Sequence, residues 1–304
     1  MNIALEEIKR YAQNMGFVAV GYAPATELTE EPERYMHSLE SGHFANMEYL
    51  KRNLEKRFNP QLLVEGAMSV LVFLAPYGKQ RDSQYIELFS SEQDATLKYK
   101  VAQYALGEDY HTVIRAKLNA VLEMMKEADP HISGRIFVDT APVLERAWAV
   151  RAGLGFIGKN NFFISREFGI RNFIGVIVSN YETEEPVNVA QTNGSGETKL
   201  SGREEKEIGK KYCGTCMKCI ENCPTGALCA PYTLDARKCT SYLTIEEKGA
   251  SFGSNMEHAG ERGDWIFGCD ACMDACPWNS RNTKGWKEFE QKRTPLESSH
   301  LRRR

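Results

Sequence analysis

CGTCMKCIENCP, residues 213–224, and CDACMDACP, residues 269–277, are the stretches from which the fold can be worked out. The first has the spacing C-x2-C-x2-C-x3-C-P and the second C-x2-C-x3-C-P. This spacing is typical of chains with two four-iron clusters, in which the cysteine before the proline crosses to the other cluster. The second stretch lacks one cysteine, and Cys239 in DARKCTSYLTIE is the candidate to supply it.

The cysteine spacing therefore predicts two iron–sulfur sites with four thiolates each. The first consists of Cys213, Cys216, Cys219 and Cys276, and the second of Cys223, Cys239, Cys269 and Cys272. The ninth cysteine, Cys229, is expected to be a buried structural thiol.

Zinc is the alternative occupant, because paired C-x2-C units also bind zinc. Clusters are favoured because a tight three-cysteine loop reaches three iron corners and the proline turns the chain toward the neighbouring cluster. Disulfides are less favoured, since MNIALEEIKR, residues 1–10, lacks the basic and then apolar pattern of a signal peptide. A reducing, cytoplasmic compartment is expected.

The composition allows one large or two medium cores in 304 residues, with 42% hydrophobic residues and a formal charge of −3. The longest apolar stretch, residues 172–179, is far shorter than the roughly twenty residues of a spanning helix, so no membrane association is expected. Residues 281–304 hold eight Lys/Arg against three Glu. This basic tail either contacts a polyanion or is a solvated terminus.

Alternating helical and strand patterns predict an α/β domain over residues 1–181. Strands are expected at residues 17–22, 69–75, 134–142, 161–165 and 172–178. A long helical stretch is expected within residues 99–128, and a second helix over residues 142–153, with Pro142 in its first turn and Gly153 as its cap. A linker or surface loop is expected at 182–207 and a ferredoxin-like domain at 208–280.

Asp139 is the acid of most interest, because it follows a buried strand whose end is a common ligand site in open α/β sheets. Partial burial would raise its pKa and suit a proton donor, although Asp139 could instead cap the helix after Pro142. GLGFIGKNN, residues 153–161, offers Lys159 and Asn160 as donors to a large ligand, or is simply a tight connection. Tyr104, Tyr110 and His111 are further polar candidates, more often packing residues than catalytic ones.

The stretches VDTAPVLERAWAVRAGLGFIGKNNFFI, CGTCMKCIENCPTGAL, DARKCTSYLTIE and IFGCDACMDACPWN together closely resemble the tRNA epoxyqueuosine reductases. With YALGEDYH and RFNPQLLVEGAMSVLVF, the resemblance covers residues 57–279. It implies a monomeric oxidoreductase that holds base-off cobalamin between a nitroreductase-like, reductive-dehalogenase-like α/β domain and a ferredoxin-like domain with two 4Fe-4S clusters. Its substrate would be epoxyqueuosine at the wobble position of the tRNA anticodon loop, reduced to queuosine.

The resemblance also implies roles for particular residues. Asp139 matches the general acid and a cobalamin contact. The other residues that look like cobalamin contacts are Arg57, Lys159, Asn160, Ser241 and Asp270. Electrons would come from a flavodoxin- or ferredoxin-like protein.

This chain departs from many members because it stops soon after CPWN, without their helical-repeat domain. The basic tail and the Lys/Arg of YLKRNLEKRF, residues 49–58, could compensate through phosphate contacts.

Two alternatives belong to other functional classes. One is a cobalamin-dependent, reductive-dehalogenase-like enzyme that acts on a small halogenated molecule. The other is an electron-transfer protein without a substrate, which would leave Asp139 without a purpose.

Overall fold

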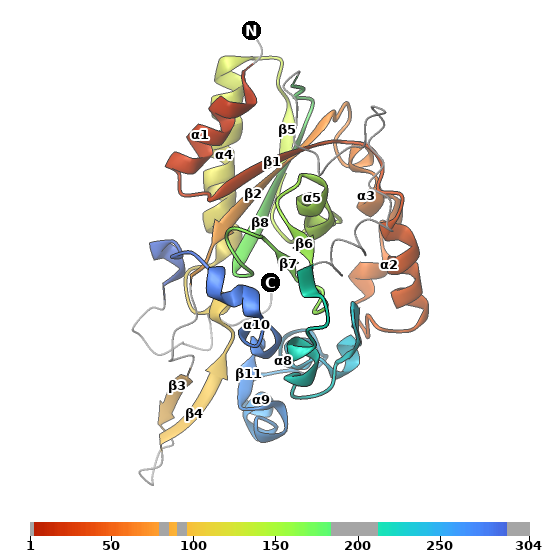
Figure 1. Ribbon diagram of the computed structural model, residues 1–304, viewed down its shortest axis with the longest axis vertical. Coiled ribbons are helices and arrows are strands. Elements are labelled where there is room, and N and C mark those ends of the chain that lie inside the picture. The colour runs from red at the N-terminus through yellow and green to blue at the C-terminus, as the bar shows by residue number, and fades with distance from the viewer. Residues whose placement is uncertain (1–2, 79–84, 90–95, 184–211, 291–304) are drawn as a thin grey trace.

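A four-stranded antiparallel sheet forms the centre of the first domain. The computed structural model describes residues 3–78, 85–89, 96–183 and 212–290. In spatial order the sheet consists of β1 (Ala19–Pro24), β2 (Ser69–Pro76), β8 (Asn172–Ser179) and β5 (Gly134–Phe137) (Figure 1). Nearly all of the expected linker at 182–207, and residues 291–304 of the expected tail, lie outside the described residues.

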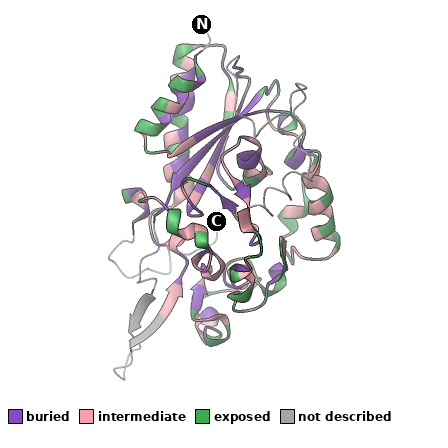
Figure 2. Ribbon diagram, in the orientation of Figure 1, coloured by how far each residue is buried: buried purple, intermediate pink, exposed green. Residues whose placement is uncertain are grey.

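Helices cover both faces of this sheet. Helices α1 (Leu5–Asn14) and α4 (Tyr110–Ala128) lie on one face, and α5 (Glu145–Arg151) lies on the other (Figure 1). Every residue of β2 is buried, with Leu71 and Phe73 in the core under α1 and α4, and Val70 and Val72 in the core under α5 (Figure 2). A strand covered on both faces needs a continuous apolar run, which explains why β2 and β8 could be predicted.

Gly175 lets α4 lie close to the sheet. A Cβ at this position would stand 2.7 Å from Leu118 Cδ1 and 3.0 Å from Ile114 Cγ2, too close for either side chain to keep its place. The first turns of α4 are therefore held at the end of the sheet where β5 leads into Asp139.

The long helical stretch expected within residues 99–128 is shorter than predicted. Its first part is strand β4 (Thr96–Val101) and the short helix η3 (Gln103–Ala105). Helix α4 begins at Tyr110 because the side chain of Asp109 caps it, accepting the backbone N–H of His111 at 3.1 Å. It ends at Ala128, as expected.

The second expected helix, α5, begins at Glu145 instead of Pro142. Gly153 directly follows its C-cap with a φ of +75°, as predicted for a helix-ending glycine. The strand expected at 17–22 lies two residues later as β1, and that at 161–165 shrinks to β7 (Phe163–Ile164), which pairs with β6 (Phe156–Ile157). A Cβ at Gly155 would meet the backbone oxygen of Ile164 at 2.1 Å, so this glycine-rich stretch is a tight connection.

The cysteine-rich region consists of short elements. They are α7 (Lys218–Glu221), β9 (Leu228–Ala230), β10 (Thr233–Leu234), α8 (Thr240–Ile245), α9 (Phe252–Glu257), β11 (Trp265–Phe267) and α10 (Ala271–Asp274). Strand β11 pairs in parallel with β4, which pairs with β3 (Tyr85–Phe89), so a second sheet joins the two domains.

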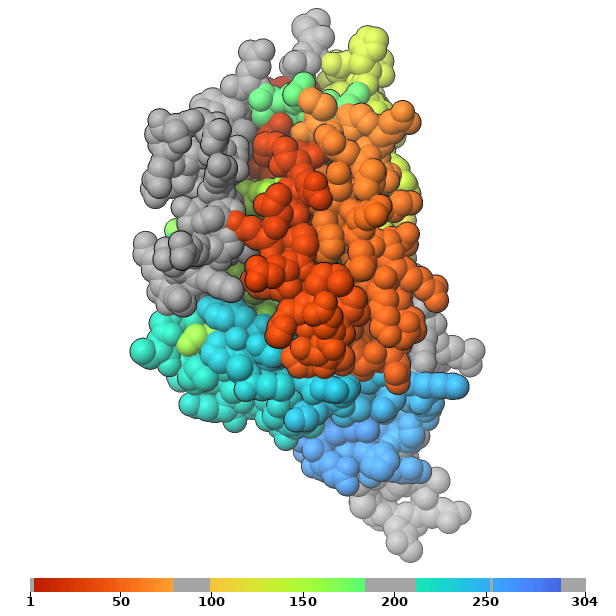
Figure 3. Space-filling model, turned by 90° about the vertical axis from the view of Figure 1, so that its right-hand side faces the viewer, coloured from red at the N-terminus to blue at the C-terminus, as the bar shows by residue number. Residues whose placement is uncertain are grey.

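The segment of α2 (Glu31–Glu40), η1 (Glu48–Lys51), α3 (Leu54–Phe58) and η2 (Pro60–Leu62) also contacts the cysteine-rich region. The backbone N–H of Ala236 donates to the oxygen of His43 at 2.9 Å, and that of Asn46 to the hydroxyl of Tyr242 at 3.3 Å. Figure 3 shows this segment, in red and orange, directly against the cyan surface of the cysteine-rich region. The two domains therefore meet on more than one side.

The described part of the expected tail packs against the first domain. Trp286 and Phe289 are buried in the core under α1 and α4, and the indole N–H of Trp286 donates to the oxygen of Gly16 at 2.7 Å. Apolar packing thus holds residues 286–289, whatever the role of the basic residues. Among the described residues, no helix has the length and apolar character needed to cross a membrane.

Candidate functional site

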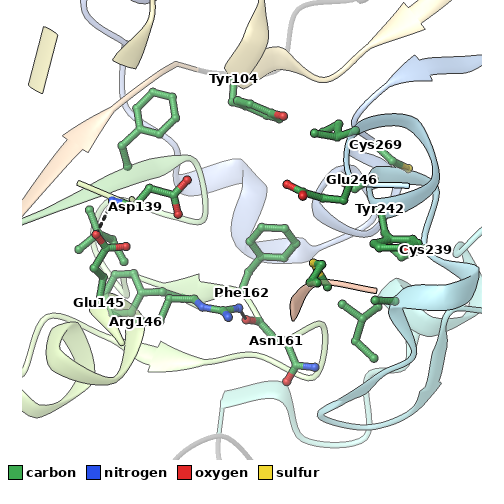
Figure 4. A pocket seen from close by; sticks show the side chains of 18 of the residues that line it. Tyr104, Asp139, Glu145, Arg146, Asn161, Phe162, Cys239, Tyr242, Glu246 and Cys269 are labelled. Atoms are coloured by element: carbon green, nitrogen blue, oxygen red, sulfur yellow. Dashed lines mark hydrogen bonds between the residues drawn. The ribbon is translucent and has the colours of Figure 1, made fainter. Parts of the chain in front are cut away.

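A large cavity lies between the first domain and the cysteine-rich region. Its volume is about 2390 Å³, several times the roughly 300–1,000 Å³ of a pocket for a drug-sized ligand. Asp139 and Glu145 face it from the first domain, and Cys239, Tyr242 and Cys269 from the other side (Figure 4). The cavity is large enough for a macrocyclic cofactor and part of a polymeric substrate.

Asp139 stands at the end of β5, where the first turn of α4 meets it. The hydroxyl of Tyr110 donates to Asp139 Oδ2 at 2.6 Å, and His111 Nε2 lies 3.5 Å from the same oxygen. His111 Nδ1 lies 2.8 Å from Asp109 Oδ1. The Asp139 side chain is nevertheless 63% exposed, because it faces the cavity.

The expectation that burial raises the pKa of Asp139 is wrong. The hydrogen bond with His111 lowers the pKa of Asp139, with a smaller contribution from Tyr110, and this outweighs the opposing effect of burial. The pKa of His111 is raised, because its bonds to Asp139 and Asp109 outweigh its own burial. While the cavity is open to water, the proton shared by Asp139 and His111 therefore resides mainly on His111.

Glu145 is the second acid at this end of the cavity. Its Oε1 accepts the backbone N–H of Asp139 at 2.5 Å (Figure 4). Burial and, to a smaller extent, the charge of Asp139 together raise the pKa of Glu145 to about 8. Two neighbouring carboxyl groups thus have opposite protonation states near neutral pH. The sequence interpretation missed Glu145, since ERAW showed only a helical pattern.

The cysteines influence one another mainly within the two predicted sets. Burial and, to a smaller extent, the thiols of Cys213, Cys219 and Cys216 raise the pKa of Cys276 to about 11. Burial and, to a smaller extent, two members of the second set, Cys239 and Cys223, raise the pKa of Cys269 to about 12. Cys219 of the first set also raises the pKa of Cys272 of the second, so these influences follow the predicted sets only in part, and ligation stays a prediction.

A single metal ion would need a tighter grouping. In the described part of the chain, no three His, Cys, Asp or Glu side chains could hold one ion. A four-iron cluster is larger than one ion, so its thiolates stand farther apart. The prediction for Cys229 is wrong, because this thiol is exposed in β9.

Five residues that line the cavity each have a buried polar atom without a hydrogen-bond partner among the described residues. These atoms are Arg57 Nε, His43 Nδ1, Asn172 Oδ1, Tyr232 Oη and Thr240 Oγ1. Buried polar groups are nearly always paired, so these atoms indicate a ligand with polar groups on its periphery. Only Arg57 was expected from the sequence. Thr240 lies beside Ser241 in the motif KCTSY and could have been suspected.

Three other residues expected to contact the cofactor are found at the cavity wall. Ser241, Asn160 and Asp270 line the cavity. The amide of Asn160 also donates to the oxygen of Cys272 at 3.4 Å. Asp270 is 1% exposed, and its Oδ2 accepts from Arg171 and from the backbone N–H of Gln103 at 2.8 Å. Its carboxylate is therefore engaged by protein donors.

Lys159 does not line the cavity, in contrast to the expectation for a cofactor contact. Its Nζ donates to the backbone oxygens of Gly214 at 2.7 Å and Cys216 at 3.0 Å. Both belong to the first three-cysteine loop, so Lys159 fixes that loop against the first domain.

Replacement of this amine is expected to weaken the first cluster site selectively. In Lys159→Met two carbonyl oxygens lose their hydrogen-bond donor, which is expected to destabilise the folded loop by about 1–3 kcal/mol. Iron content after anaerobic reconstitution is expected to fall from about eight toward about four atoms per chain. Lys126→Met, which removes a surface pair with Glu123, is the control. Full iron content in Lys159→Met would contradict this role.

Arg171 is a structural residue that the sequence did not indicate. Its side chain is 0% exposed, and Nη1 donates to Asp270 Oδ2 at 3.0 Å. Nη2 donates to Asp274, and Nε donates to Asn279 Oδ1 at 3.1 Å. One guanidinium at the start of β8 thus binds the loop and helix around Cys272 and Cys276.

Two known protein families match this chain, one in the cysteine-rich region and one in the first domain. Residues 212–279 match the family described as 4Fe-4S double cluster binding domain. Residues 57–140 match the family described as Epoxyqueuosine reductase QueG, DUF1730. The epoxyqueuosine reductase of Cyclobacterium marinum is 37% identical over 284 residues, which cover 92% of this chain and 80% of that protein. The chain belongs to the epoxyqueuosine reductase family.

Other members show the same likeness. The epoxyqueuosine reductase of Escherichia coli is 33% identical over 301 residues, covering 99% of this chain and 72% of that protein. A solved epoxyqueuosine reductase with an epoxyqueuosine-modified tRNA-Tyr stem loop has a TM-score of 0.73 at 26% identity, covering 94% of this chain and 68% of that one. The same values hold for the Bacillus subtilis epoxyqueuosine reductase with its catalytic loop swung out of the active site.

Membership in the epoxyqueuosine reductase family makes the chain an oxidoreductase. It also confirms the predicted order of a mixed helix and sheet domain followed by a double-cluster domain.

Proposed function

We propose that this chain reduces epoxyqueuosine to queuosine at the wobble position of tRNA. The observation that supports this most is the cavity itself, where Asp139 faces the second cysteine set in a chain 37% identical to an epoxyqueuosine reductase. Opening the epoxide and losing water consumes two electrons and two protons. The site therefore needs a reductant on one side and a proton source on the other.

We propose that Cys213, Cys216, Cys219 and Cys276 hold one 4Fe-4S cluster, and that Cys223, Cys239, Cys269 and Cys272 hold the other. The unpartnered polar atoms of the cavity fit the amide side chains of a corrin, with Arg57, Thr240 and Ser241 as holding residues. When bound, the clusters and cobalamin supply low-potential electrons and a reactive cobalt centre.

The protein's own contribution is proton delivery at Asp139. A bound substrate would exclude water from this carboxylate, and desolvation raises the pKa of an acid. The proton held by His111 can then move onto Asp139 Oδ2, which faces the cavity. Tyr110 keeps the carboxylate oriented through its hydrogen bond. We propose that Asp139 donates this proton to the epoxide oxygen.

Binding of tRNA would use the arginines around the cavity. Arg52, Arg115 and Arg146 are exposed and line it. Such cations position a nucleic acid through its phosphates, while the extruded base is recognised inside the pocket. The basic residues 291–304 lie outside the described residues and are proposed as additional phosphate contacts.

We also propose a cytoplasmic monomer that receives electrons from a flavodoxin- or ferredoxin-like protein, with domains at 1–181 and 208–280. Both cysteine sets are completed within one chain, which supports a monomer. Light scattering on a sizing column tests this proposal, and a dimer mass would overturn it.

Substrate choice is the experiment that tests the function. The reconstituted, reduced protein is offered epoxyqueuosine-containing tRNA, the same tRNA without the modification, and a halogenated phenol. We expect conversion of the modified tRNA alone. Dehalogenation without tRNA conversion would move the assignment to a small-molecule reductase.

A further inference from the structure

The loop that holds Asp139 has a backbone that needs external support. Asp139 has a φ of +58°, in the left-handed region that non-glycine residues adopt at a cost. The N–H of Thr140 donates to the oxygen of Val138 at 2.7 Å, and that of Val143 to Ala141 at 2.8 Å. These contacts close two three-residue turns in succession. Such a conformation persists only where neighbouring groups hold it.

The support comes from the helix that follows the loop. Glu145 is the first residue of α5, and its Oε1 accepts the backbone N–H of Asp139 at 2.5 Å. The same helix packs against the sheet through its buried residues Trp148, Ala149 and Val150. This packing fixes the position of Glu145. The hydrogen bond therefore joins α5 to Asp139, the loop residue whose carboxylate faces Tyr110 and His111.

The charge state of Glu145 suits this contact. The groups facing it are Asp139 on the loop, Arg146 on its own helix, and His111 on α4. Burial raises the pKa of Glu145 to about 8, so the carboxyl is largely neutral at pH 7 and does not repel Asp139. Because the pKa is raised above its ordinary value, ionisation costs the folded arrangement stability as pH rises from that value through about 8.

We propose that Glu145 is a positioning residue, whose carboxyl holds the Asp139 backbone and so keeps the Asp139 carboxylate turned into the cavity. It acts on the loop, while Asp139 acts on the substrate. The expected effect of Glu145 on turnover rests on the proposed function. Its expected effect on the conformation of the Asp139 loop is independent of that function.

Amide hydrogen exchange of the peptide spanning residues 138–144 tests the contact directly in the reconstituted protein. Glu145→Ala removes the acceptor, and this peptide is expected to exchange about tenfold faster than in the wild type. Glu145→Gln keeps a neutral acceptor of the same length, so wild-type exchange is expected. Glu127→Gln, an exposed change on α4, is the matched control. Wild-type exchange in Glu145→Ala would overturn the proposal.

Kinetics separate positioning from general stability. Glu145→Ala is expected to lower kcat about 100-fold with little change in KM, because a displaced catalytic group costs that much. Glu145→Gln should retain kcat at pH 7 and lose less activity than the wild type between pH 7 and pH 9. A Gln variant as defective as Ala, or with the wild-type pH profile, would overturn the proposal. If the wild type converts no tRNA, the proposed function fails, and the exchange result still decides the contact.

Discussion

Asp139→Asn is expected to lower the turnover of epoxyqueuosine-containing tRNA by about 10²–10⁴-fold, the usual contribution of a positioned general acid. Asparagine has the same shape as aspartate and tolerates the left-handed backbone of this position. It can still accept hydrogen bonds from Tyr110 and His111, but it cannot pass a proton to the substrate. Single-turnover rates measured by nucleoside mass spectrometry give the size of the effect.

The control for this variant is retention of the two clusters. Iron and sulfide content of Asp139→Asn should equal the wild type, because Asp139 contacts none of the eight cluster cysteines in the hydrogen bonds of the described residues. Glu65→Gln removes an exposed carboxyl group outside the cavity, and this variant should keep full turnover. If Asp139→Asn turns over at the wild-type rate, Asp139 is not the acid.

Arg171→Met is expected to destabilise the protein by about 3–5 kcal/mol, the cost of breaking a buried ion pair from one side. Methionine fills part of the volume but leaves Asp270, which is 1% exposed, without its cationic partner. Asp274 also loses its bond to the guanidinium. Denaturant unfolding under anaerobic conditions measures the loss.

Arg166→Met provides the matched comparison. Arg166 is exposed and donates to the hydroxyl of Tyr212 at 3.0 Å, so its replacement should cost about 1 kcal/mol or less. The double variant Arg171→Met with Asp270→Asn should recover part of the loss, because the unpaired charge is removed. A cost of about 1 kcal/mol or less for Arg171→Met would contradict the role of Arg171 in joining the domains.

The features predicted correctly from the sequence have local signals. Cysteine spacing indicates the double-cluster domain, because the ligands of one loop lie a few residues apart. Strands β2 and β8 are continuous apolar runs because both faces of their sheet are covered. Gly153 is predicted as a helix end because its positive φ requires no distant partner.

The features that were missed depend on distant partners. Residues 96–100 pair with the nearby strand β3, but the end of β4, at residues 100 and 101, pairs with β11, more than 160 residues later. The pKa of Asp139 is lowered by side chains from α4, nearly 30 residues earlier. Arg171 is an isolated arginine in GIRNF, and only the folded chain brings it to Asp270. No spacing rule in the sequence indicates such contacts.

The most direct test of the central claim is a single-turnover assay on a short anticodon stem loop that contains epoxyqueuosine. The protein is loaded with both clusters and cobalamin, reduced anaerobically and mixed with the stem loop, and the nucleosides are identified by mass spectrometry. We predict queuosine, with the mass of one oxygen lost, from the wild type and not from Asp139→Asn. An unchanged epoxyqueuosine nucleoside after incubation with fully loaded wild-type protein would contradict the account.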